Sequence, residues 1–172
     1  GPVSRLLAIM DPKVFLNGQL VDAQQACISV GDTGLLHGAS VFTTMRAHNA
    51  RVFRLEQHLE RLGQSVRRFG LQTDADATVR TLSGGVQELL KANGLVEARV
   101  RITLTSGAPG GAPTTVITAE ALPDYPPQWY SKGLSVVVSS FRQSAADPVA
   151  GWKTGSYFSR VLARQQVAGK GA

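Results

Sequence analysis

The sequence predicts an α+β fold, and two observations carry that prediction. Segments that alternate apolar and polar residues, as strands do, lie before and after a pair of amphipathic helical segments rather than alternating with them. A proline-rich stretch at residues 123–127 then interrupts the chain, and a new apolar segment follows it. We therefore expect an N-terminal α+β domain over residues 1–124, a linker at 125–131 and the start of a second domain over 132–172.

The composition indicates a soluble globular chain and argues against two classes of partner. The 172 residues are 43% hydrophobic with a formal net charge of +6, and no apolar run approaches the ~20 residues that span a bilayer. Arg67 and Arg68 form the only adjacent basic pair, and aromatic residues do not interleave with the basic ones as they do on many nucleic-acid-binding surfaces. Scattered arginines suit anionic small molecules, so we expect neither nucleic acid nor membrane as a partner.

The single cysteine and the first residues bear on the location of the protein. Cys27 has no intrachain partner for a disulfide, which favours a cytoplasmic location, and we expect its side chain to pack as a small buried hydrophobe. Residues 1–9 are too short for a convincing signal peptide, and Met10 is a candidate native start.

The first strands are predicted from turn chemistry. Asn17-Gly18 between the apolar runs 14–16 and 19–21 is the strongest hairpin signal in the chain. A second short apolar run at 26–30 ends at a glycine-flanked break, in which Asp32 or Thr33 can cap a helix. Residues 41–47 alternate and are rich in β-branched side chains, so they predict a strand that turns at 48–50 and returns through 51–53.

Two helices follow. Helical spacing on one face is shown by Leu55, His58, Leu59, Leu62, Val66 and Phe69. Gly70 ends this helix, and a second one runs from a cap at Thr73 or Asp74 to Asn93-Gly94, with glycines at 84 and 85 weakening its middle.

The second half alternates again. Residues 99–105 and 114–119 predict two strands joined by a turn at 107–113, and after the linker we expect a strand at 134–138 and a last helix at 157–167. Lys153 lies between these two, after a small-residue apolar loop. Most lysines are solvated surface charges, but a lysine shielded from water can react as a neutral amine with the carbonyl group of a cofactor.

Four segments, in order, resemble one group of proteins. They are residues 15–18, 34–46, 53–62 and 153–157, and together they are similar to the fold-type IV pyridoxal-phosphate enzymes, which include branched-chain and D-amino acid aminotransferases and 4-amino-4-deoxychorismate lyases. The resemblance implies a two-domain fold-type IV enzyme, pyridoxal 5'-phosphate as cofactor, an amino acid-like substrate, no metal and a homodimer.

The resemblance also implies roles for individual residues. Lys153 would carry the cofactor as an aldimine and move protons, Arg61 would bind its phosphate, and Tyr157 would hydrogen-bond its phenolic oxygen. The residues expected around the substrate are Phe42, Thr44, Arg46 and Arg101. Without the resemblance, each residue has a simpler reading: a solvated charge for the lysine and arginines, and a core aromatic for Phe42 and Tyr157. His37 is expected to pack, and His58 to lie on the helix face.

The resemblance leaves the reaction open. The pattern Phe-Thr-Thr-Met-Arg at 42–46 is most similar to some 4-amino-4-deoxychorismate lyases, which eliminate pyruvate to give 4-aminobenzoate for folate synthesis. Branched-chain aminotransferases usually show glutamate-glycine where this chain has Thr43-Thr44. D-amino acid aminotransferases usually show arginine where it has Ser106. We therefore expect a lyase, with an aminotransferase as the alternative and a non-catalytic small-molecule-binding relative or fragment as the third possibility.

The chain departs from the family in its second half. Family members are considerably longer and supply a glutamate for the pyridine nitrogen after the lysine segment, whereas no acidic residue follows Asp147 here. We therefore expect residues 132–172 to be an incomplete second domain of a longer protein.

Overall fold

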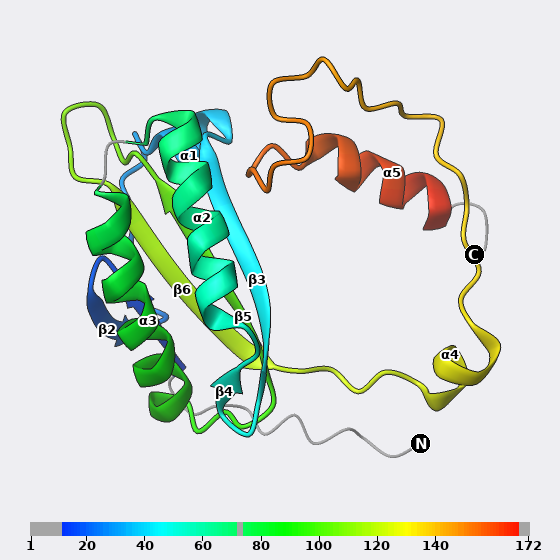
Figure 1. Cartoon of the computed structure of the whole chain (residues 1–172), viewed down its shortest axis with the longest axis horizontal. Helices are drawn as coiled ribbons and strands as arrows, with labels where there is room; N and C mark the ends of the chain where they lie inside the picture. The colour runs from blue at the N-terminus through cyan, green and yellow to red at the C-terminus, as the bar shows by residue number, and fades with distance from the viewer. Residues whose placement is uncertain (1–11, 72–73, 169–172) are drawn as a thin grey trace.

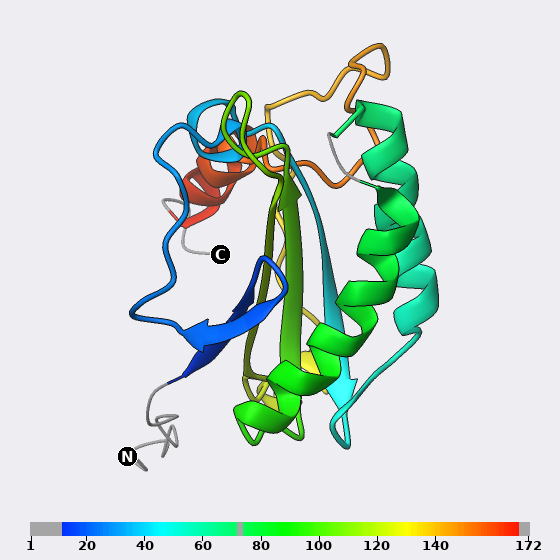
Figure 2. The same ribbon diagram turned by 90° about the vertical axis from the view of Figure 1, so that its left-hand side faces the viewer.

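The computed structural model describes residues 12–71 and 74–168 as an antiparallel sheet with two helices on one face (Figures 1 and 2). Within these residues the sheet has six strands in the order β2-β1-β6-β5-β3-β4. The strands are β1 (Lys13–Leu16), β2 (Gln19–Asp22), β3 (Ser40–His48), β4 (Arg51–Val52), β5 (Ala98–Thr105) and β6 (Thr114–Ala121). The helices are α1 (Thr33–His37), α2 (Leu55–Phe69), α3 (Ala75–Ala92), α4 (Pro127–Lys132) and α5 (Phe158–Ala168).

The β1–β2 hairpin forms as predicted. Asn17 and Gly18 both have positive φ, 50° and 90°, as a two-residue turn with right-handed strand twist requires. The Asn17 side chain also accepts a hydrogen bond of 2.8 Å from the backbone N–H of Thr115, so the turn is attached to the start of β6.

The two faces of β3 have different surroundings, because successive side chains point to opposite sides of a strand. Val41, Thr43 and Met45 are buried beneath α2 and α3, and they pair in register with Leu104, Ile102 and Val100 of β5. The face that carries Phe42 and Thr44 lies on the side of the sheet away from those helices (Figure 2).

The helices begin and end where local chemistry predicts. Asp32 caps α1 by accepting the Gly34 N–H at 2.7 Å. Gly70, at φ 61°, ends α2. Asp74 accepts the Ala77 N–H at 3.0 Å at the start of α3, while the alternative cap, Thr73, lies outside the described residues.

Asp32 also joins α1 to the sheet. Its fully buried carboxylate accepts the hydroxyls of Thr105 at 2.8 Å and Thr114 at 2.6 Å, at the ends of β5 and β6. Burial disfavours the ionised form, but these hydrogen bonds and those from the backbone of Gly34 and Leu35 outweigh it, so the pKa of Asp32 lies below its ordinary value.

Three expectations were wrong. Residues 134–138 form no strand, because no strand among the described residues pairs with their N–H and C=O groups, and Val136 remains 87% exposed. Residues 26–30 have no regular structure, and Cys27 is exposed rather than buried because the loop that carries it runs over the surface. His37 is also exposed, at the end of the one-turn helix α1.

The segment after β6 contains one element that was not expected. Helix α4 lies across the predicted linker at 125–131, beginning at a proline, and Tyr125 packs on Trp129 with ring centroids 5.6 Å apart. The division into domains at 1–124 and 132–172 stays a prediction. Among the described residues, no helix is both long and apolar enough to cross a bilayer.

Candidate active site

The lysine segment is attached to the outer edge of β3. The Phe42 N–H donates to the Lys153 carbonyl at 3.0 Å, and the Gly155 N–H donates to the Ser40 carbonyl at 2.8 Å. Thr154 forms an isolated antiparallel bridge with Val41 between these two bonds. Lys153, which is far from β3 in the chain, is thus placed by the sheet itself.

A small residue at position 155 allows this close approach. A Cβ at Gly155 would lie 2.0 Å from the Ser40 Oγ and 3.2 Å from the Gly38 carbonyl oxygen. The loop before β3 bends toward the same segment, since Gly38 adopts φ 65° and a Cβ there would lie 3.3 Å from the Ser156 Oγ. The glycines at 38 and 155 therefore let two segments come together at the point where Lys153 is held.

Phe42 is the centre of the first half of the site. Its ring is 4% exposed, and the Arg101 Cζ lies 3.8 Å from the ring centroid. The Lys153 Nζ lies 5.4 Å from the same centroid, and the Tyr157 ring packs edge-on at 5.4 Å. Four predicted site residues, from β3, β5 and the segment before α5, therefore meet around one aromatic ring.

Arg61 forms the second half of the site, on α2. Its Nη2 donates to the Thr43 Oγ1 at 3.2 Å and lies 3.2 Å from the His58 Nδ1. The Thr43 hydroxyl lies 2.9 Å from the same nitrogen. Because Thr43 follows Phe42 in β3, the two halves of the site lie on opposite faces of one strand, next to the edge that holds Lys153.

The pKa of His58 lies below its ordinary value. Burial is the main cause, and the positive charges of Arg61 and then Lys153 lower it further. His58 therefore feels both cations, although Arg61 lies on the helix-facing side of β3 and Lys153 lies at its edge beside Phe42.

The site has positive charge without a matching carboxylate. Within residues 12–71 and 74–168, no ion pair joins Lys153, Arg61 or Arg101 to an acidic side chain. Burial lowers the pKa of Arg101, although Tyr157 acts in the opposite direction. Lys153 and Arg101 are partly removed from water whereas Arg61 is exposed, and cations without acidic partners favour a bound anion.

This donor set fits pyridoxal phosphate at two points. A lysine amine can react with the cofactor aldehyde, and a guanidinium without an acidic partner suits a phosphate dianion. For the pyridine nitrogen, the described residues place no carboxylate in contact with the cluster. No group of three or more His, Cys, Asp or Glu side chains suited to a metal occurs among them.

Two of the residues expected around the substrate lie further from the amine. Thr44 pairs in register with Arg101, is half-buried and lies two residues beyond Phe42 along β3. Arg46 is four residues beyond Phe42 along β3, and its guanidinium lies 3.4 Å from the Glu97 Oε2.

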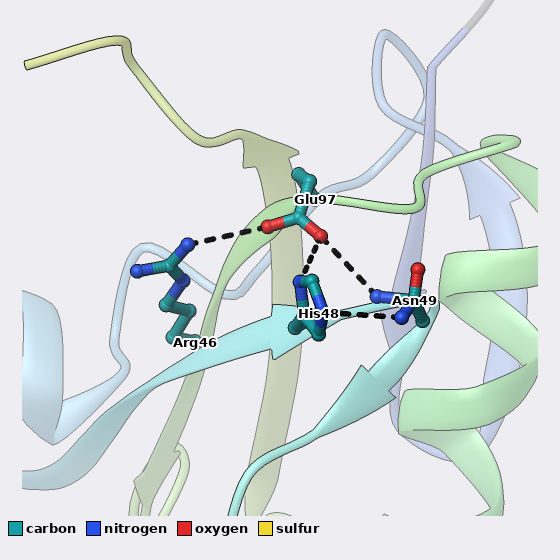
Figure 3. Close-up of polar contacts among 4 residues, drawn as sticks. All are labelled: Arg46, His48, Asn49 and Glu97. Atoms are coloured by element: carbon teal, nitrogen blue, oxygen red, sulfur yellow. Dashed lines mark hydrogen bonds and ion pairs between the residues drawn. The ribbon is translucent and has the colours of Figure 1, made fainter.

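Glu97 contacts several residues at this end of the sheet. Its carboxylate also contacts His48 and accepts the Asn49 N–H at 3.3 Å (Figure 3). Arg46 therefore contacts Glu97 near the β3–β4 turn and does not lie in the Lys153 cluster.

His58 and Thr43 are the residues that sequence reasoning missed. His58 was expected only on a helix face, and Thr43 only as a strand residue. A signal for the pair existed, because His58 and Arg61 are three residues apart and therefore share one face of α2. The buried hydroxyl of Thr43, by contrast, could be placed beside them only by the packing of α2 on β3.

A large cavity lies beside this cluster and not within it. It has a volume of about 1140 Å³, and its lining comes from α1, from residues in 139–149, from Trp152 and from residues in 154–163. Tyr157 belongs to both the cavity and the cluster, whereas Lys153 and Arg61 do not line the cavity. We assign the chemistry to the cluster because its reactive and charged groups converge there, and Tyr157 connects it to the open space.

Comparison with known proteins is consistent with this arrangement. A putative branched-chain-amino-acid aminotransferase of Methanocaldococcus jannaschii is 34% identical over 163 residues, which cover 90% of this chain and 55% of that protein. A branched-chain amino acid aminotransferase from T.th., solved with pyridoxamine 5'-phosphate, superposes with a TM-score of 0.82 at 24% identity, over 95% of this chain and 58% of that one. The 4-amino-4-deoxychorismate lyase of Pseudomonas aeruginosa superposes with a TM-score of 0.74 at 24% identity, over 89% and 56%.

These matches differ in what they establish. At 24% identity the two solved structures show the fold, which is that of the fold-type IV enzymes, and this chain spans little more than half the length of each of the three proteins. The sequence profile described as "Amino-transferase class IV" matches residues 40–172, which is most of the chain and includes every residue of the cluster. The chain therefore belongs to the class IV aminotransferases, a family whose enzymes use pyridoxal phosphate.

Proposed function

We propose that this protein is a pyridoxal-phosphate-dependent enzyme that acts on an amino acid-like substrate. One observation carries the proposal: Lys153, Arg61 and Arg101 converge on the Phe42–Thr43 stretch of β3 with no carboxylate among their described partners. An amine beside separate guanidinium groups suits a cofactor that carries an aldehyde and a phosphate, together with a substrate that carries a carboxylate.

The residues then take distinct parts. Lys153 would hold the cofactor through its amine and afterwards move a proton at the substrate α-carbon, while Arg61 would bind the phosphate and Tyr157 would hydrogen-bond the cofactor's phenolic oxygen. When bound, pyridoxal phosphate supplies an electron-withdrawing ring that stabilises negative charge at the α-carbon. Arg101 is fixed over Phe42 at 3.8 Å, so its guanidinium can receive the substrate carboxylate without a large loss of side-chain entropy. Phe42 and Thr44 form the strand face beneath it.

Transamination is the reaction that the relatives support best. The relative from Methanocaldococcus jannaschii, described as a putative branched-chain-amino-acid aminotransferase, covers 90% of this chain. In that reaction Lys153 would take up the α-proton and later give it back, so the same amine would serve both proton transfers.

Elimination of pyruvate from aminodeoxychorismate is the second candidate. The pattern at residues 42–46 favours it, because it resembles the corresponding segment of 4-amino-4-deoxychorismate lyases. The solved structure of such a lyase shares the fold but not enough sequence to distinguish the reactions. Both reactions require Lys153.

The cofactor proposal is tested by trapping. The chain, and the longest natural form that contains it, would be mixed with pyridoxal phosphate, reduced with borohydride and mapped by mass spectrometry. We expect a visible absorption band and a reduced adduct on Lys153, lost in Lys153→Ala and kept in Lys132→Ala, which removes an exposed lysine on α4. No adduct on Lys153 in the longest form would contradict the enzyme and favour a non-catalytic binding protein.

The reaction is tested separately by product. Keto-acid-dependent transfer of the amino group identifies an aminotransferase, and release of 4-aminobenzoate from aminodeoxychorismate identifies the lyase. Activity in neither assay, with the Lys153 adduct present, would show that the proposed reactions are wrong while the cofactor assignment is right.

We also propose that the enzyme is a cytoplasmic homodimer. The single, exposed thiol of Cys27 supports a reducing compartment. Exposed apolar side chains of Val136, Val138 and Phe158 in the second half of the chain offer surface that a second subunit can cover. Sedimentation of the longest natural form as a monomer would contradict the dimer.

A further inference from the structure

The contacts of Arg61 favour one tautomer of His58. A guanidinium only donates hydrogen bonds, and its Nη2 lies 3.2 Å from the His58 Nδ1, so this contact is satisfied by the tautomer in which Nδ1 carries no proton. The Thr43 hydroxyl, 2.9 Å from the same nitrogen, therefore donates to it and accepts from Arg61 at 3.2 Å. The result is a directed chain from Arg61 through Thr43 to a neutral His58 with its proton on Nε2.

Each member of this chain is held by the fold. Thr43 is 1% exposed on the helix-facing side of β3, and His58 and Arg61 lie three residues apart on the opposing face of α2. Arg61 itself is exposed, and a long exposed side chain usually samples many rotamers. Thr43 and His58, two acceptors on rigid elements, therefore restrict the Arg61 side chain, which would otherwise be mobile.

The acceptors are also neutral. A carboxylate in the place of Thr43 or His58 would orient Arg61 equally well but would cancel much of its charge. A hydroxyl and a neutral imidazole leave the guanidinium positive and leave its remaining N–H groups free to bind an anion.

We propose that Thr43 and His58 are positioning residues that hold the Arg61 guanidinium in one orientation, without neutralising it, for the dianionic phosphate of the cofactor. This inference rests on the proposed function, in which Arg61 binds that phosphate. A simpler possibility is that His58 only satisfies the buried hydroxyl of Thr43, in which case the three residues stabilise the packing of α2 and have no effect on the anion.

The two possibilities differ in the preference for pyridoxal phosphate over pyridoxal, which lacks the phosphate. The ratio of their dissociation constants isolates the interaction with the phosphate from the reaction at Lys153. The variant Thr43→Val removes the hydroxyl at constant shape, and Thr43→Ser is the matched control that keeps it. His58→Phe removes the acceptor, and His58→Asn keeps one near the position of Nδ1.

We expect Thr43→Val and His58→Phe each to reduce the preference about tenfold, as for the loss of one hydrogen-bond partner of a charged group, with Thr43→Ser and His58→Asn within about twofold of the parent. An unchanged preference in Thr43→Val would overturn the proposal, and so would an equal loss of affinity for both ligands, because a purely structural role affects them alike.

A second measurement does not depend on the cofactor. In the unmodified chain, long-range ¹H–¹⁵N spectra at neutral pH should show His58 as the neutral tautomer protonated on Nε2, with a changed Nδ1 resonance in Thr43→Val. If the parent protein binds neither ligand, the proposed function fails, but this spectrum still decides the arrangement. A proton on Nδ1 would show that the chain from Arg61 to His58 does not exist.

Discussion

Replacing Gly155 by alanine tests whether the sheet edge is what places Lys153. Gly155 does not have a positive φ, so the backbone there accepts an L side chain and any effect comes from contacts. The added Cβ would lie 2.0 Å from the Ser40 Oγ, 3.2 Å from the Gly38 oxygen and 3.4 Å from the Ser40 Cβ. Rotation of Ser40 relieves the first contact only in part, because Ser40 is buried, so the lysine segment should move away from β3.

The size of the effect follows from the bonds that hold the segment. Two backbone hydrogen bonds attach residues 153–155 to β3, of 3.0 Å and 2.8 Å. At about 1 kcal/mol each, their loss amounts to about 2 kcal/mol, or a roughly thirtyfold fall in the docked population. Lys153 would remain in the sequence but would lose its position over Phe42.

Hydrogen exchange measures this directly, because the Phe42 amide donates to the Lys153 carbonyl. We expect its exchange to become ten- to thirtyfold faster in Gly155→Ala, on the estimate above, and the borohydride-fixed adduct on Lys153 to decrease in parallel. The double variant Ser40→Ala/Gly155→Ala removes the 2.0 Å contact and should recover most of the protection, while Ser40→Ala alone should exchange like the parent. Unchanged protection in Gly155→Ala, or no recovery in the double variant, would refute the reasoning.

Three further outcomes are expected. In α3, Gly84→Ala should stabilise the fold by about 0.5–1 kcal/mol, because a Cβ there meets open space. Gly85→Ala should destabilise it by about 1–3 kcal/mol, because its Cβ would lie 2.7 Å from the Phe15 ring. Urea unfolding midpoints that shift in the same direction for both variants would contradict this. Asp32→Asn should lower the free energy of unfolding at pH 7 by about 1–3 kcal/mol, since one oxygen that accepts buried hydrogen bonds becomes a donor. The pKa of Asp32 is lowered in the folded state. The difference in free energy of unfolding between the parent and Asp32→Asn should therefore be complete above the unfolded-state pKa of about 3.9 and disappear as the pH falls through the folded-state pKa. A difference that does not depend on pH would contradict the lowered pKa of Asp32. The pKa of His58 is also lowered, first by burial and then by the two cations, so its ring resonances should titrate below about 6.5, and this group should contribute a loss of stability as the pH falls through that value; a midpoint at or above 6.5 would show that burial and the charges of Arg61 and Lys153 do not act on it in this way.

The local elements could be predicted because their causes lie within a few residues. Asn17-Gly18 has the two positive φ angles that a tight hairpin needs, and the amphipathic pattern of α2 ends at Gly70. Asp32 was recognisable as a cap because a short acceptor preceded a helical segment. Its bonds to β5 and β6 were not predictable, since the partners are 73 and 82 residues away.

The residues of the site were predicted less completely than the local elements. Lys153, Phe42, Tyr157 and Arg101 meet around one ring, whereas Arg61 lies on the other face of β3 beside Thr43, and the functional roles of all five stay predictions. Arg46 belonged to the same sequence motif as Phe42 but is directed to Glu97, because a strand extends by about 3.3 Å per residue and carries it to the other end of the sheet. The strand expected at 134–138 failed for a related reason: its alternating pattern is local, but a strand also needs a neighbour.

The sequence by itself determined the hairpin, the limits of α2 and α3 and the family, and it predicted Lys153 as the reactive amine. Only the tertiary structure decided that Lys153 extends the edge of β3, that Arg101 covers Phe42, and that Thr43 links Arg61 to His58. The physical reason is the range of the forces involved. Turns and caps depend on neighbours in the chain, whereas strand register and the packing of α2 on β3 bring together groups whose separation in sequence carries no information about their distance in space.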